Sequence, residues 1–87
     1  MQIFINFNNH TYVIDVNNNT TFNYIVNYIF DRVSCNRNLF NKFSNSVYFV
    51  HNSKYINDFN KSLIDYNITN NDSINCHIKN NNFNDKI

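Results

Sequence analysis

Cysteine and histidine are the residue types in this chain best suited to nucleophilic chemistry. The sequence has two cysteines and three histidines, and Cys76 and His77 are neighbours. A cysteine nucleophile needs a base beside it that a third group orients. Adjacent residues of a strand point to opposite faces, so Cys76 and His77 cannot form that pair. We therefore expect Cys76 to be a small core residue, Cys35 to be the more exposed thiol, and the chain to have no catalytic site and not to be an enzyme.

Metal, phosphate and nucleic-acid sites also lack their usual residue patterns. The possible zinc ligands do not have the two-to-four-residue spacing of zinc sites; they are His10, Cys35, His51, Cys76 and His77. The chain has no glycine, so a Gly-rich phosphate loop is excluded. Its seven basic and six acidic residues are scattered and form no basic face for phosphates. We expect no metal, no cofactor and no nucleic-acid partner.

The composition is that of one small globular domain. The 87 residues are 43% hydrophobic and 17% aromatic, and more than twenty are asparagine, whereas proline is absent. No apolar run approaches the roughly 18 residues of a membrane span, and there is no signal-peptide pattern. Two separate cysteines without a CxxC motif suggest a reducing compartment. These features predict a protein of the cytosol or the nucleus, without a membrane association.

Two alternating runs at the start of the chain predict a β-hairpin. Met1, Ile3, Ile5 and Phe7 recur with a period of two, which places them on one face of a strand. A second alternating run, Thr11–Val16, follows after three residues that include two asparagines. Asparagine tolerates positive φ, so this short link favours a tight turn between antiparallel strands.

An amphipathic helix is expected next. Apolar residues recur at helical spacing over Phe22–Val33, after two threonines that are good N-cap residues. Tyr24 and Tyr28 lie four residues apart on the outer flank of this helix. They either edge the core, which we favour, or form an aromatic contact strip for a protein partner.

The remainder of the chain contains short elements. Residues 34–46 read as an irregular polar segment, in which Phe40 and Phe43 either plug the base of the core, the favoured interpretation, or are exposed for an interaction. Short strands are expected at Val47–Val50 and Lys54–Ile56, one helical turn at Leu63–Asn67, and a final strand in Ser73–Lys79. Residues 80–87 have little apolar content and are predicted to be a flexible C-terminal tail.

Two stretches of this sequence resemble ubiquitin and its relatives. They are the opening Met-Gln-Ile-Phe and the run Leu63–Ile68 that precedes a short final strand. The resemblance covers residues 1–79 and implies an α+β fold of the β-grasp type, a mixed sheet with one main helix packed across it. In that arrangement the last strand pairs in parallel with the first at the centre of the sheet.

The same resemblance indicates which surfaces to inspect for function. Conjugated relatives end in Gly-Gly, whereas the corresponding positions here are Asn82 and Phe83, so conjugation by the usual route is not expected. The apolar patch that ubiquitin receptors bind corresponds to Phe49 on the third strand and to Asn75 and His77 on the last strand, with Asn8 or Asn9 at the hairpin tip. Only one of these is apolar, which puts binding to ordinary ubiquitin receptors in doubt.

The functional hypothesis is a divergent, non-conjugated ubiquitin-like protein that acts as a protein-protein interaction module or adaptor, a monomer on its own. Its candidate contact residues are Phe49, Asn75, His77, Tyr24 and Tyr28. Lys54 lies where the family's main chain-building lysine lies and is the candidate acceptor, although a solvated side chain is the favoured interpretation. Two alternatives remain open: an elongin-B-like subunit of a ubiquitin-ligase or transcription complex, and a modifier that works by an unusual route.

Overall fold

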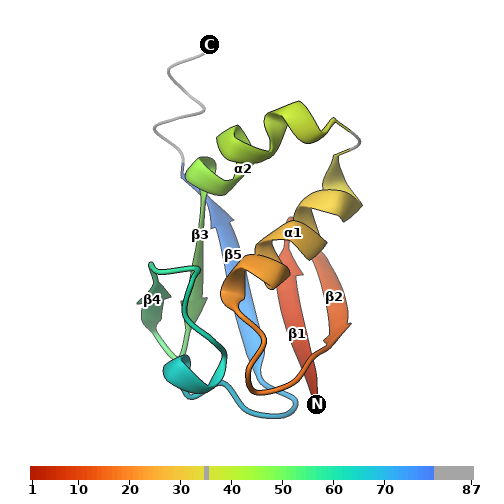
Figure 1. The fold of residues 1–87 in the computed structure, drawn as a ribbon. Coiled ribbons are helices and arrows are strands. Elements are labelled where there is room, and N and C mark those ends of the chain that lie inside the picture. Colours follow the sequence, from red (N-terminus) through yellow and green to blue (C-terminus); the bar gives the residue numbers. More distant parts are fainter. Residues whose placement is uncertain (35, 80–87) are drawn as a thin grey trace.

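The first strand of the chain lies inside a five-stranded mixed sheet. The computed structural model describes residues 1–34 and 36–79. Its strands are β1 (Gln2–Phe7), β2 (His10–Asp15), β3 (Val47–His51), β4 (Lys54–Ile56) and β5 (Ser73–Ile78), in the spatial order β2-β1-β5-β3-β4. β1 pairs in parallel with β5, and its other neighbour, β2, is antiparallel (Figure 1). The parallel pairing of the first and last strands confirms the prediction.

Residues in the left-handed region, three asparagines and one serine, close the two hairpins. Asn8 and Asn9 have φ values of 55° and 64° and join β1 to β2. Asn52 and Ser53, with φ values of 51° and 66°, join β3 to β4 in the same way. Positive φ at both central residues matches the right-handed twist of the flanking strands, so these are the turns that hairpins prefer.

The helix α1 (Phe22–Val33) crosses one face of the sheet and has the predicted bounds (Figure 1). It buries a stripe of apolar residues: Phe22, Ile25, Val26, Ile29 and Phe30. Phe22 meets Phe49 of β3 edge to face, with 4.9 Å between ring centroids, and stacks on Phe59 at 5.8 Å. Phe22 and Phe49 are fully buried, so this aromatic group joins the helix to the sheet at the centre of the core.

Backbone carbonyls, rather than the predicted threonine side chains, satisfy the start of α1. Thr21 occupies the N-cap position but makes no side-chain cap hydrogen bond. The Phe22 and Asn23 N–H groups donate to the carbonyls of Lys61 and Phe59, at 2.9 and 2.8 Å. The first N–H groups of a helix have no partner within it, so the 59–61 loop supplies acceptors and is fixed against α1.

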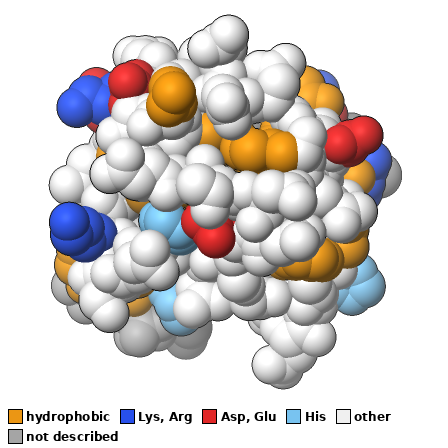
Figure 2. All heavy atoms as spheres, turned by 90° about the horizontal axis from the view of Figure 1, so that it is seen from below, with side chains coloured by type: hydrophobic (Ala, Val, Ile, Leu, Met, Phe, Trp, Pro, Cys, Tyr) orange, Lys and Arg blue, Asp and Glu red, His pale blue; other side chains and the backbone are white. Residues whose placement is uncertain are grey.

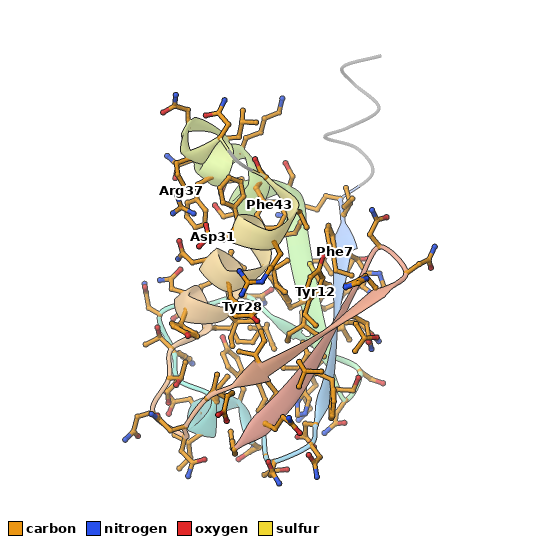
Figure 3. The ribbon with its side chains drawn as sticks, turned by 90° about the vertical axis from the view of Figure 1, so that its right-hand side faces the viewer. Phe7, Tyr12, Tyr28, Asp31, Arg37 and Phe43 are labelled. Atoms are coloured by element: carbon orange, nitrogen blue, oxygen red, sulfur yellow. The ribbon has the colours of Figure 1, made fainter. Side chains whose placement is uncertain are left out.

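The segment predicted to be irregular contains two helices. A 3-10 helix η1 (Arg37–Leu39) leads into α2 (Phe40–Ser46), which was not foreseen. Phe40 and Phe43 both pack on Phe30 of α1, at 5.3 Å between centroids, and Phe43 also meets Phe7 (Figure 3). These contacts confirm that Phe40 and Phe43 close the base of the core.

A second 3-10 helix, η2 (Ile64–Tyr66), forms the predicted single turn before β5. Among the described residues, no helix has the length and apolar character needed to cross a membrane. The predicted tail, residues 80–87, and Cys35 lie outside the described residues.

Truncating the buried ring of Phe49 should strongly destabilise the fold. Phe49→Ala removes a fully buried aromatic side chain that contacts Phe22 and Phe59. We expect the free energy of unfolding in urea to fall by about 3–5 kcal/mol, the usual cost of such a cavity. Tyr24→Ala, at a ring that is 52% exposed, is the control and should change it by less than about 0.5 kcal/mol. Equal effects of the two substitutions would contradict the placement of Phe49.

Candidate protein-interaction site

The sheet face not covered by α1, called here the outer face, carries a row of hydrogen-bonded polar side chains. The Asn6 Nδ2 group donates to Ser73 Oγ and to Asn75 Oδ1, both at 2.9 Å. The Thr11 hydroxyl donates to Asn6 Oδ1 at 2.8 Å. This amide row (Thr11, Asn6, Ser73, Asn75) links β2, β1 and β5, and its hydrogen bonds hold the side chains in defined orientations.

An aromatic cluster lies on the outer face beside the amide row. Tyr48 of β3 stacks on His77 of β5, with 5.2 Å between ring centroids and 30° between planes. Tyr55 of β4 contacts Tyr48 at 5.5 Å and is 64% exposed. The aromatic cluster (Tyr48, Tyr55, His77) therefore presents two exposed rings, Tyr55 and His77, and the half-buried ring of Tyr48 to solvent.

A hollow of about 660 Å³ opens between the tip of the β1–β2 hairpin and the aromatic cluster. Its lining includes the turn residues Asn8, Asn9 and His10 on one side and Tyr48 and His77 on the other. Among the described residues, the lining contains no lysine, arginine, aspartate or glutamate. Recognition in this hollow would depend on hydrogen bonds and aromatic contacts rather than on ion pairs.

Comparison with known proteins identifies the fold. No protein-family model and no curated protein matches the chain by sequence. A solved structure does match: the solution NMR structure of the ubiquitin-like domain of an Arabidopsis thaliana protein, with a TM-score of 0.71 and 15% identity over 91% of this chain and 77% of that chain. The chain has the ubiquitin-like β-grasp fold. The fold implied by the opening strand and by the Leu63–Ile68 run is thus confirmed.

In this ubiquitin-like fold, Phe49 is not on the outer face, and its prediction as an exposed anchor is wrong. Its side chain is 0% exposed, because Val47, Phe49 and His51 point inward along β3. Tyr48 and Val50 point outward instead. The register offers the missed signal: Phe49 lies opposite Cys76, which was already expected in the core, and Tyr48 lies opposite His77.

The other predicted contact residues divide between two surfaces. Asn75 and His77 are exposed on the outer face, as expected. Tyr24 and Tyr28 lie on α1, which covers the opposite face of the sheet, so the structure does not bring them together with the aromatic cluster (Figure 1). Tyr28 packs against the core and lies under the Arg32 guanidinium at 4.1 Å.

Lys54 is exposed at the start of β4, opposite His51 in the register. This agrees with the interpretation of a solvated side chain, and its role as an acceptor stays a prediction.

The ionisable groups of the described residues form no catalytic arrangement around Cys76. Burial raises the pKa of the Cys76 thiol to about 12, which keeps it protonated and unreactive. Cys76 points into the core and His77 to the outer face, as predicted from their adjacency. Within residues 1–34 and 36–79, no group of three or more metal-ligating side chains converges.

A buried histidine pairs with an aspartate away from the outer face. His51 Nε2 lies 2.9 Å from Asp72 Oδ2, which also accepts the Thr69 N–H at 2.9 Å. The hydrogen bond from Thr69, with a smaller contribution from His51, lowers the pKa of Asp72 despite its partial burial. Figure 2 shows the molecule from below, where the coloured charged side chains are scattered and form no continuous patch. The pair fixes the end of β3 to the turn before β5.

The Asp72 carboxylate should make stability depend on pH. Its folded pKa lies below its ordinary value of 3.8, so its contribution is present above that value and is lost as the pH falls through the folded pKa. We expect Asp72→Asn to lower the free energy of unfolding at about pH 7 and to matter less at about pH 2.5, as measured by urea unfolding. Asp15→Asn, at a side chain that is 96% exposed, is the control. A pH-independent effect of Asp72→Asn would contradict this account.

Proposed function

We propose that this chain is a ubiquitin-like interaction module, not itself conjugated, that binds a protein partner through its outer face. The observation that supports the proposal is the exposed aromatic cluster beside the hollow. Tyrosine is enriched in protein interfaces and among the residues that contribute most to binding. The hollow next to the cluster is large enough to receive side chains of a partner.

The contact residues are held in position before a partner arrives. Tyr48 stacks on His77 and contacts Tyr55 at an inclined angle, and Asn6 is hydrogen-bonded to three side chains of the amide row. Side chains that are already ordered lose less freedom on binding, so more of the contact energy contributes to affinity. Asn75 accepts from Asn6 through Oδ1, and the described structure gives its amide nitrogen no intramolecular acceptor, so that nitrogen can donate to a partner.

The amide row also sets the kind of partner. It crosses the middle of the outer face and separates the aromatic cluster from Phe4 and Val13 at the other end. A broad apolar patch, such as ordinary ubiquitin receptors require, is therefore not formed. We infer a partner that offers backbone or amide groups to the row and an apolar or aromatic side chain to the cluster.

Substitutions in the aromatic cluster should weaken partner binding. The full chain is immobilised, bound proteins are captured from the native lysate, and the captured partner is purified and titrated against wild type, Tyr55→Ala and His77→Ala. We expect each substitution to raise the Kd by about tenfold or more, the usual effect at an interface centre. Tyr24→Ala is the matched control, since it removes another exposed tyrosine from the opposite side of the molecule.

Amide chemical shifts recorded during the titration locate the contact. Changes confined to β3, β5 and the 8–10 turn would support the outer face. Binding that is lost in Tyr24→Ala and retained in Tyr55→Ala would contradict the proposal.

The proposal of no conjugation has its own test. Asn82 and Phe83 stand where conjugated relatives have Gly-Gly, and the resemblance implies that the activating enzyme accepts only residues without side chains at those positions. Incubation of the chain with ubiquitin-activating enzyme and ATP should give no thioester, whereas ubiquitin in a parallel reaction should. A reducible adduct formed through the chain's own carboxyl terminus would refute the proposal and favour the modifier alternative.

A further inference from the structure

The strand β2 is an open edge of the sheet. Its six residues pair with β1 in an unbroken register from Gln2–Asp15 to Phe7–His10, and within residues 1–34 and 36–79 its other side has no strand neighbour. In most proteins, the edge strands of a sheet are protected from pairing with another strand. They are very short, or they carry charged residues (especially lysine), proline or a bulge. The opposite edge, β4, has three residues and carries Lys54. β2 is longer, has no lysine, proline or bulge, and carries one acidic side chain, Asp15, so its edge is less protected than that of β4.

The hydrogen bonds at one end of β2 determine which of its backbone groups face outward. Met1 and Val16 exchange both of their backbone hydrogen bonds, at 2.7 and 2.8 Å. In an antiparallel ladder, bonded and non-bonded pairs alternate. His10, Tyr12 and Ile14 therefore direct their N–H and C=O groups toward β1. The corresponding groups of Thr11, Val13 and Asp15 point away from the sheet.

We propose that β2 pairs antiparallel with β2 of a second copy of this chain, about a two-fold axis at Val13. Directly opposite residues of paired strands share a face of the sheet. In this register Val13 lies opposite Val13 of the other copy, and Thr11 lies opposite Asp15. Every outward N–H and C=O of Thr11, Val13 and Asp15 then has a partner. If the two strands slide by two residues in either direction, the outward backbone groups of Asp15 or of Thr11 are left unpaired.

The side chains of β2 are complementary to themselves in this register. Val13, a large apolar residue that is 47% exposed, is covered by its own copy. On the other face, Tyr12 lies opposite Ile14 of the second copy, which is already buried in its own core, so Val13 provides the main new side-chain contact. Tyr12 lies between the hairpin and α1, on the side of the molecule that Figure 3 shows.

Charges do not oppose this pairing. The side chains of β2 that can carry a charge near neutral pH are those of His10 and Asp15. Asp15 lies opposite Thr11 and His10 lies opposite Val16, so no like charges meet across the axis. The residue that faces its own copy, Val13, is neutral.

The pairing would give one continuous sheet across both copies, with the two outer faces on the same side. Because it uses the backbone edge of β2, it does not depend on the aromatic cluster. A partner with two binding segments would then meet two aromatic clusters on one surface, which raises the apparent affinity without a new contact.

Sedimentation equilibrium of the full chain from about 10 µM to about 1 mM tests the pairing, because this range detects a dimer with a micromolar to millimolar dissociation constant. Val13→Lys places two like charges at the axis while the side chain stays at an exposed position of the monomer. We expect it to weaken the dimer by about tenfold or more. Tyr55→Lys, which adds the same charge on the opposite edge strand, is the matched control and should leave the dimer unchanged. A thermal melt followed by circular dichroism checks that both variants fold.

Amide hydrogen exchange gives a residue-specific test on the wild-type chain. Protection of the Thr11, Val13 and Asp15 amides should rise with protein concentration, while that of Tyr12 and Ile14 should not change. A monomer throughout the concentration range, as the sequence predicted, would overturn the proposal. So would a dimer that Tyr55→Lys dissociates and Val13→Lys does not, or protection of these amides that appears only when a different protein is added.

Discussion

The parallel pairing of β1 with β5 is the interaction on which the rest of this structure depends. It joins residues 4–7 to residues 73–76, nearly the whole length of the described chain. The pairing places Ile5 beside Ile74 and Phe7 beside Cys76, all of them buried. The segment that connects the two strands contains α1, and this helix packs over their apolar side. The pairing thus sets the position of the core.

The same pairing builds the outer face. Strand residues alternate between faces, so the register that buries Ile5 and Ile74 also brings Asn6 beside Asn75 in the solvent. Their side-chain hydrogen bonds follow directly from that placement. The core and the candidate interaction site are therefore two consequences of one strand register. A shift of the register by one residue would turn the apolar side chains of a strand to the outer face and its polar side chains to the core.

Local patterns in the sequence were sufficient for the elements that bury a regular stripe. The period of β1 and the spacing of apolar residues in α1 identified both elements, and the helix bounds agreed at Phe22 and Val33. The helix α2 has no such stripe: it has seven residues, mostly asparagine and serine, which are poor helix formers. It forms because Phe40 and Phe43 reach Phe30, a contact that the tertiary structure creates. The capping of α1 by the 59–61 loop depends on tertiary structure in the same way.

The candidate site was only partly predictable, because it depends on how strands are paired rather than on what each contains. Asn75 and His77 were placed correctly, since the alternation of β5 around the buried Cys76 decides their face. Phe49 was misplaced because the alternation of β3 leaves two choices until its register with β5 is known. The stack of Tyr48 on His77 and the contact of Tyr48 with Tyr55 need the order of three strands. The sequence pattern of a single strand does not specify the order of the strands in the sheet.

The turns of this glycine-free chain have a consequence for the thermodynamics of folding. In the part of the chain that the structure describes, the residues at positive φ are five asparagines and a serine: Asn8, Asn9, Asn52, Ser53, Asn67 and Asn71. Glycine would adopt these angles without steric cost, but it loses more backbone entropy than any other residue when the chain folds. Asparagine samples fewer backbone conformations than glycine in the unfolded state, so it loses less entropy on folding. This smaller loss offsets part of the steric cost of its positive φ. The residues that form these left-handed turns therefore lose less backbone entropy on folding than glycines at the same positions would.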